Sequence, residues 1–322
     1  MDNPNVNKQQ CLPDMEALLG EHDERLHPML FVHIFCSFID EPAVQRTRIQ
    51  MLHLLGNSLP EDIHSYLMGG ENGYNTIGKR PDYPDTQQEW QKQSTAYYLR
   101  LKNGKRSFRE DTFRPKISHL GVRIPLDIFT DSQAFLKWVL SLELLQSPSL
   151  FSATAGYYLH ADSFMYGKKF DAFLMAHPGF EYIIENTVDR IGSIYSEQHR
   201  ILKPELARIN WLNALGEDAY LLIPDGQEGL RETLQQHPSL TLHTLPHGFV
   251  VQAGPQPSPG ENGRAPEAYY AATQLLEPFL KLDPHTNDLE TLDWAEHFYT
   301  PERMKKVKER KQLWSRLINW VD

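Results

Sequence analysis

Residues 30–39 read LFVHIFCSFI, a run rich in aromatic and β-branched side chains. Such side chains pack well on a pleated sheet, and a short apolar run of this kind is typical of a strand covered on both faces. Asp40 and Pro42 follow the run as a helix N-cap and an early helical proline. We therefore predict a buried strand and then a helix that ends near Gly56.

Three further strands and a second helix are predicted outward from this strand. The strands are expected at residues 96–101, 117–124 and 151–159, and the helix begins near residue 131. The resulting order is β-α-β-β-α-β, the split βαβ pattern of a ferredoxin-like sandwich. Residues 69–93 hold four glycines and two prolines, and they predict a long exposed loop.

The second half of the chain is expected to mix short strands with helices. The predicted elements are a helix over 163–176, a strand over 180–185, an apolar stretch over 209–216, hairpin arms over 240–245 and 249–253, a helix opened by Pro266, and a basic C-terminal helix. The fold class is thus α+β, with antiparallel or mixed sheets and packed helices. We expect a polar leader at 1–28, an N-terminal subdomain at 29–160 and a C-terminal subdomain at 161–322, joined in one compact unit.

The charge balance indicates the kind of partner. The chain has 32 basic and 42 acidic side chains, a net charge of −10. Residues 301–316 carry seven basic and two acidic side chains, a local +5, so the remainder carries −15 by subtraction. This balance argues against nucleic acid as a direct ligand and favours a basic protein partner. Trp314, Leu317 and Trp320 predict that the basic helix packs on the body.

We expect the protein to work in the cytoplasm without a cofactor or a membrane contact. Its first ten residues do not form a signal peptide, and no stretch approaches the ~20 apolar residues that span a bilayer. Cys11 and Cys36 are the two cysteines, which is too few for a disulfide framework or a zinc site.

One near match to a phosphate-binding loop is rejected. Residues 73–80 read GYNTIGKR, with Arg80 where a serine or threonine would hold magnesium. Pro81 and Pro84 follow, and they are incompatible with the helix whose N-terminus would cradle phosphates. We interpret this segment as part of the exposed loop.

No other group of residues predicts catalysis. His160 and Asp162 could be paired metal ligands, but two ligands rarely make a site. His177 precedes a turn proline, and Ser193 lacks the flanking glycines of a nucleophile elbow. Cys36 lies within the predicted strand, where a thiol is inert. We therefore expect no catalytic, cofactor-binding or metal-binding residues.

Several short motifs occur in an order that resembles one known family. They are HLGVRIP at 119–125, HPGF at 177–180, INWLNALG at 209–216, VVQAGPQP at 250–257, GEN at 260–262 and PEAY at 266–269. In this order they resemble the type VI secretion immunity family, first catalogued as a proteobacterial domain of unknown function. The resemblance covers about residues 97–280. The glycine-rich element that often follows the Trp-Leu motif is reduced here to PDGQEG at 224–229.

The family motif itself contains residues with structural roles. Trp211 is expected to anchor a core, Gly254 and Gly260 to permit turns, and Pro266 to start the helix that carries Tyr269. The resemblance implies an immunity protein that binds and neutralises a co-encoded effector toxin. A cytoplasm-acting nuclease with a basic domain fits the charge of the chain. The two alternatives are a hydrolase that uses His160, Asp162 or His177, and a structural component of the secretion apparatus.

The contact residues are a hypothesis built on charge. Exposed acidic loops would meet the nucleic-acid surface of the toxin and occlude its active site. The proposed contact residues are Glu217, Asp218, Asp225, Glu228, Glu261, Asp82 and Asp85.

Overall fold

The computed structural model describes residues 26–36, 42–43, 46–47, 50–51, 54, 65–70, 73–76, 87–91, 98–102, 118–161, 173–181, 194–196, 201–206, 208–280 and 305. The first 25 residues of the predicted leader lie outside this set, and residues 26–28 belong to the first strand. Lys305, which is exposed, is the one described residue of the predicted basic helix.

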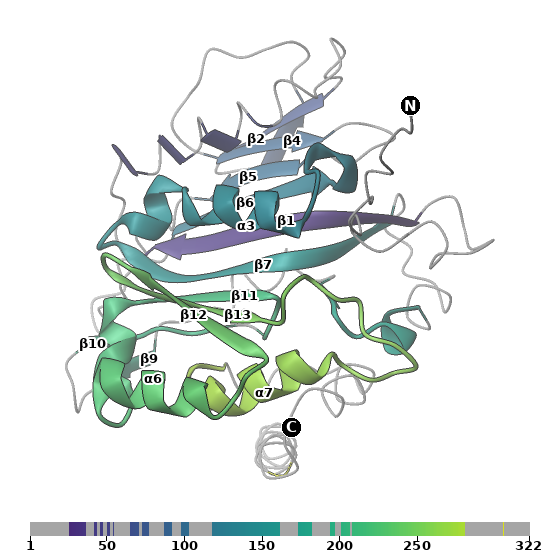
Figure 1. Cartoon of the computed structure of the whole chain (residues 1–322). Coiled ribbons are helices and arrows are strands. Elements are labelled where there is room, and N and C mark those ends of the chain that lie inside the picture. Colours follow the sequence, from purple (N-terminus) through teal and green to yellow (C-terminus); the bar gives the residue numbers. More distant parts are fainter. Residues whose placement is uncertain are drawn as a thin grey trace, which may run out of the picture.

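A long sheet runs through the molecule and carries most of the described elements (Figure 1). Its order is β12-β13-β11-β7-β1-β6-β5-β4-β2-β3, with β8 parallel to β7 and the other pairs antiparallel. The strands are β1 (Leu26–Cys36), β2 (Ser65–Gly70), β3 (Gly73–Thr76), β4 (Gln87–Gln91), β5 (Tyr98–Lys102), β6 (Ser118–Pro125), β7 (Leu150–Ala161), β8 (Phe180–Glu181), β11 (Leu212–Gly216), β12 (Leu240–Leu245) and β13 (Gly248–Ala253). A separate pair joins β9 (Ile194–Ser196) to β10 (Ile201–Lys203).

Helices cover parts of this sheet. They are α3 (Ser132–Leu140), α6 (Gly226–Gln235) and α7 (Glu267–Leu275), with short 3-10 turns η1 (Leu126–Ile128), η2 (Glu143–Gln146), η3 (Glu217–Leu222) and η4 (Glu277–Phe279). Helical backbone also occurs at 42–43, 46–47, 50–51 and 54, within the first predicted helix. The α+β class predicted from the sequence is confirmed. No helix among the described residues is both long enough and apolar enough to cross a membrane.

The four strands predicted in the first half lie in the order β7-β1-β6-β5, each antiparallel to the next. The fourth strand thus flanks the first, and the third separates the first from the second. This is the strand arrangement of the split βαβ unit. On the far side of β7, β11 continues the same sheet, so both predicted subdomains contribute strands to it.

The prediction of a long exposed loop over residues 69–93 is wrong. The segment contains the end of β2, all of β3 and all of β4, which pair as neighbouring antiparallel strands. Glycine and polar residues disfavour strands on their own, but pairing with an existing sheet edge supplies backbone hydrogen bonds whatever the side chains are. The near P-loop consequently starts within a strand. Residues 77–86 lie outside the described residues.

A second correction concerns residues 224–229, where Asp225 and Glu228 were predicted to lie in an acidic loop. The first turn of α6 starts here, after Asp225, whose φ is 56°. Leu230 and Leu234 are both buried, one helical turn apart. Two apolar positions at this spacing form a narrow stripe that anchors the helix on the core, although the rest of it is polar.

The main core lies between the sheet and its helices. The side chains of Leu30, Val32 and Ile34 point to this side of β1, and each is fully buried. Asp131 caps α3 by accepting the Ala134 amide at 2.7 Å. This cap sets the helix so that Phe135 stacks on Trp211, with ring centroids 5.9 Å apart. The motif tryptophan thus lies where the two halves of the chain meet.

Candidate protein-binding surface

The residues of the family motif are mostly buried. Trp211 has no exposed surface, and its indole Nε1 donates to the Gly254 carbonyl at 3.0 Å. Gly254 has a φ of 87°, in the left-handed region that favours glycine. The bond ties β11 to the turn that follows β13, so these two residues close the end of the sheet.

The same turn continues into α7. Pro266 stands at the N-cap of α7, and Tyr269 is fully buried in its first turn. The Tyr269 hydroxyl accepts the Ser258 amide at 3.3 Å, and burial raises the pKa of this tyrosine. Gly260 has a φ of 74°, and a Cβ there would lie 2.6 Å from the Arg264 carbonyl oxygen. Pro266, Tyr269 and Gly260 thus shape the turn, and none of the three offers an exposed reactive side chain.

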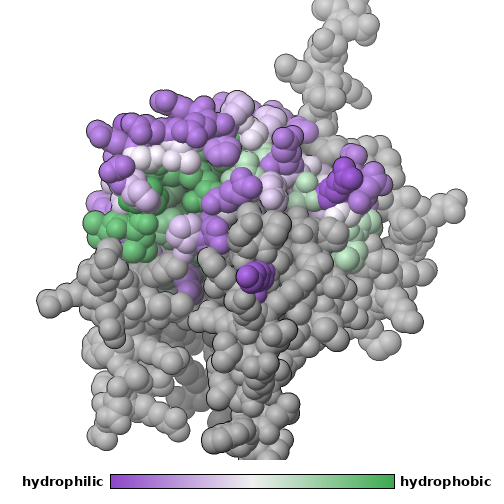
Figure 2. All heavy atoms as spheres, turned by 90° about the horizontal axis from the view of Figure 1, so that it is seen from below, coloured by the Kyte–Doolittle hydropathy of each residue, from purple (hydrophilic) through white to green (hydrophobic). Residues whose placement is uncertain are grey.

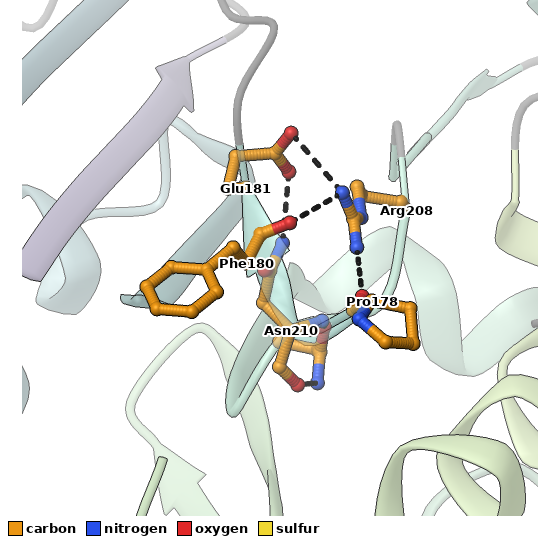
Figure 3. Close-up of polar contacts among 6 residues, drawn as sticks. Pro178, Phe180, Glu181, Arg208 and Asn210 are labelled. Atoms are coloured by element: carbon orange, nitrogen blue, oxygen red, sulfur yellow. Dashed lines mark hydrogen bonds and ion pairs between the residues drawn. The ribbon is translucent and has the colours of Figure 1, made fainter. Parts of the chain in front are cut away.

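A buried set of polar side chains, which we call the polar junction, lies beside this turn. It consists of Glu181, Arg208, Asn210 and Asn213, all of which are buried. Arg208 Nη1 donates to the Phe180 carbonyl at 2.9 Å, and Nη2 donates to the Pro178 carbonyl at 2.8 Å (Figure 3). Arg208 Nη1 also lies 3.6 Å from Glu181 Oε1.

The asparagines extend the polar junction to the sheet. Asn210 Nδ2 donates to Glu181 Oε2 at 3.2 Å. Asn213 Oδ1 accepts the Asn210 amide at 2.8 Å, and Asn213 Nδ2 donates to the Asn210 carbonyl at 2.7 Å. Buried charges are tolerated when they are paired and hydrogen-bonded. The polar junction therefore fixes β8 and the approach to β11, and it is a structural feature.

Of the residues that the hydrolase alternative would use, His177 makes contacts that position the chain. Its Nδ1 lies 2.9 Å from the Gly260 carbonyl oxygen, and its ring packs on Phe173 at 4.7 Å between centroids. His160 lies in β7 with its backbone paired to His27, while Asp162 and Ser193 lie outside the described residues. In the described part of the chain, no three His, Cys, Asp or Glu side chains are grouped to hold a metal ion.

Four of the proposed contact residues share one exposed region. Glu217 and Asp218 open η3, and Asp225 and Glu228 lie at the start of α6; all four are exposed. We call η3 and α6 together the acidic segment. It begins where β11 ends at Gly216 and returns the chain to β12. Figure 2 views the molecule from the side on which α6 and α7 lie and shows mostly hydrophilic side chains around a hydrophobic patch.

The electrostatics of the acidic segment are those of a hydrated surface. His247 Nδ1 in the β12–β13 turn lies 3.1 Å from Glu217 Oε2; the Glu217 side chain is exposed and that of His247 is partly exposed. Partial desolvation, and then the neighbouring Glu217, raise the pKa of Asp218. Leu221 of η3 is 58% exposed, the largest exposure of a bulky apolar side chain among the described residues. An exposed leucine among carboxylates is available to a partner.

The remaining contact residues lie elsewhere. Glu261 is exposed on the turn after Gly260, where its amide donates to the Arg264 carbonyl at 3.1 Å. This turn rests on residues 176–179 through Gly179 and Gly263, not on the acidic segment. Asp82 and Asp85 lie outside the described residues.

The polar junction was not predicted from the sequence. A usable signal was present, because Arg208 and Asn210 flank Ile209 immediately before the buried Trp211. A charge inside an apolar motif is rarely solvated and needs a partner. The identity of that partner, Glu181, depends on the parallel pairing of β8 with β7, which no local pattern reveals.

The comparisons with known proteins agree with this architecture. A solved structure described as Pseudomonas aeruginosa T6SS protein PA0821 superposes with a TM-score of 0.60, at 16% identity, over 92% of this chain and 94% of that one. At that identity the likeness shows a shared fold. No curated protein sequence matches the chain significantly.

The family assignment comes from the sequence match. The TsiV family, described as type VI immunity for VRR-NUC, matches residues 85–302. That is about two thirds of the chain, and the chain belongs to this family. The resemblance drawn from the ordered motifs is thereby confirmed.

Proposed function

We propose that this protein binds a VRR-NUC nuclease effector of a type VI secretion system and neutralises it by covering its active site, without catalysis. The observation that carries the proposal is the match to the TsiV family over residues 85–302. The motif residues in that span, including Trp211 and Tyr269, are buried in the fold. Neutralisation is therefore assigned to the exposed surface.

The charge of that surface supports a nuclease as the target. A nuclease domain binds phosphates with basic side chains, so its active-site face is electropositive. The acidic segment presents the carboxylates of Glu217, Asp218, Asp225 and Glu228 to solvent. Complementary charge accelerates association and orients the partners. Since the substrate of such a nuclease is in the cytoplasm, we place the immunity protein there as well.

The contact is proposed to centre on the acidic segment. Leu221 would bury its exposed side chain against the partner while the surrounding carboxylates pair with basic groups. Glu261 would form a second, separate contact, and Asp82 and Asp85 would extend the surface. Charged residues at the rim of an interface contribute mainly to rate and specificity, and a desolvated apolar anchor contributes more to affinity.

Co-expression tests the proposal. Cells that produce the nuclease encoded beside this chain should survive when the chain is co-produced, and the two proteins should co-purify. A matched control nuclease from an unrelated family should be neither bound nor neutralised. Loss of viability despite stable production of both proteins, with no co-purification, would overturn the proposal.

A further inference from the structure

The strand β12 ends the described sheet, and one of its edges has no partner strand among the described residues. Its register with β13 runs from Leu240↔Ala253 to Leu245↔Gly248 without a shift. An open edge presents a row of unpaired backbone donors and acceptors to solvent. The hydrogen bonds of β13 show which residues of β12 present these unpaired groups.

The direction of the β13 amides alternates along the strand. The Gly254 amide donates to the Ser239 carbonyl at 2.8 Å, toward β12, whereas the Ala253 amide donates to the Trp211 carbonyl at 2.7 Å, toward β11. Because this alternation continues along the strand, the hydrogen-bonded pairs between β13 and β12 are 252 with 241, 250 with 243, and 248 with 245. The backbone groups of Leu242 and Thr244 therefore point away from β13, to the open edge.

This edge lacks the features that usually prevent strand addition. Natural edges carry a lysine, another charge, a proline or a bulge. The six residues of β12, LTLHTL, include none of these. His243 is held by Gln252 Oε1 at 2.7 Å, and Thr244 is exposed. Among the described residues, the edge is thus a regular and uncharged template for another strand, with Thr244 exposed and Leu242 partly exposed.

We infer that the open edge of β12 receives an extended segment of the basic nuclease partner as an added antiparallel or parallel strand. The inference rests on the proposed function and assigns a second element of its interface. Strand addition obtains affinity from main-chain hydrogen bonds, so it tolerates variation in the partner's side chains. The acidic segment would then select the partner while β12 binds its backbone.

The charge beside β12 favours a basic occupant over a second copy of this chain. Residues 217–235, which lead directly into β12, contain five carboxylates and one arginine, Arg231, a local net of −4. A basic strand on this edge would lie in an attractive potential. Two copies paired edge to edge would bring two such regions together and repel each other.

Hydrogen exchange of the full chain tests the inference directly. In the free protein, the Leu242 and Thr244 amides should exchange rapidly, while the Thr241 and His243 amides, which bond to β13, are protected. On binding the nuclease, exchange at Leu242 and Thr244 should slow by at least tenfold. Unchanged exchange at both residues in a demonstrated complex would overturn the inference and leave the proposed function standing.

A pair of variants tests the same edge by affinity. Thr244→Pro removes an amide that bonds to nothing in β13, which an edge strand tolerates. Thr244→Ala removes the same side chain but keeps the amide. Thr244→Pro should weaken nuclease binding by tenfold or more, and Thr244→Ala should bind within about twofold of wild type.

The other outcomes are equally decisive. Equal binding by Thr244→Pro and wild type rejects strand addition at β12. A wild-type dimer in solution that Thr244→Pro dissolves also rejects it, because the occupant would be a second copy. Absence of any binding by wild type removes the proposed function and this inference together, a result distinct from the previous two.

Discussion

The polar junction and the acidic segment are both built from charged and amide side chains, yet they differ in exposure. Glu181 in the polar junction has 7% of its side chain exposed, and Glu217 in the acidic segment has 56%. Glu181 is paired with Arg208 and accepts a hydrogen bond from Asn210, whereas Glu217 lies at the surface beside the partly exposed His247. A desolvated charge must be satisfied inside the fold.

Under the proposed function, this difference separates the residues that stabilise the fold from those that recognise the partner. Changes in the polar junction should alter the free energy of unfolding and reach binding only through the fold. Changes in the acidic segment should alter partner binding with little effect on unfolding, because exposed charges contribute little to stability. The following substitutions test this separation, from the largest expected effect to the smallest.

Arg208→Met should cause the largest loss of stability. It leaves Glu181 buried without its guanidinium partner and two carbonyls without their donor. Breaking a buried pair in this way costs about 3 to 5 kcal/mol of unfolding free energy. Urea denaturation measures this loss of unfolding free energy. Arg231→Met, at an exposed arginine of α6, is the matched control and should change stability by less than about 0.5 kcal/mol.

Asn213→Ala should destabilise the chain by a smaller amount. The Asn210 amide and carbonyl both lose a buried partner, but both are neutral groups, so the expected loss is about 1 to 3 kcal/mol of unfolding free energy. Thermal unfolding followed by circular dichroism is the measurement, with Gln235→Ala at the exposed end of α6 as control. Equal melting temperatures for the two variants would contradict a structural role for the polar junction.

Neutralising the acidic segment should slow association without unfolding the protein. The double variant Asp218→Asn with Glu228→Gln should reduce the rate of nuclease binding by about 3- to 10-fold at low salt, with the loss shrinking as salt rises. Asp127→Asn with Glu267→Gln removes the same charge from exposed positions of η1 and α7. Stopped-flow kinetics that show equal slowing by both variants would assign the effect to net charge, not to the acidic segment.

The single substitution Asp218→Asn should have the smallest effect, a slight change in melting temperature that depends on pH. Because partial desolvation and Glu217 raise the pKa of Asp218 above 3.8, the folded protein holds this proton more tightly than the unfolded chain. Stability therefore falls as pH rises from about 3.8 through the folded pKa. The variant should melt slightly above wild type at pH 7 and together with it below pH 3.8. A lower melting temperature at pH 7 contradicts this sign.

Local patterns predicted much of the fold. The LFVHIFCSFI run lies largely in β1, the two hairpin arms are β12 and β13 within one residue, and α7 begins directly after Pro266. Each depends on a contiguous signal: an apolar run, a turn between alternating strands, or a proline that fits the first helical turn.

Elements that depend on distant partners were not predictable in this way. The strands β3 and β4 have polar or glycine-rich sequences and form because neighbouring strands pair with them. Helix α6 rests on just two buried leucines, Leu230 and Leu234, within an otherwise polar stretch. The partner of Arg208 lies 27 residues away, on a two-residue strand. The proposed contact residues stay predictions, because exposure permits binding without identifying the partner.

The most direct measurement is a titration of nuclease activity with the purified chain. Because a binding inhibitor acts in proportion to its amount, DNA cleavage by the VRR-NUC partner should fall linearly and end at one equivalent. Such an end point supports neutralisation by non-catalytic occlusion. Complete loss of activity at a small fraction of an equivalent would indicate turnover, and unchanged cleavage at excess would indicate no inhibition; either result contradicts the account.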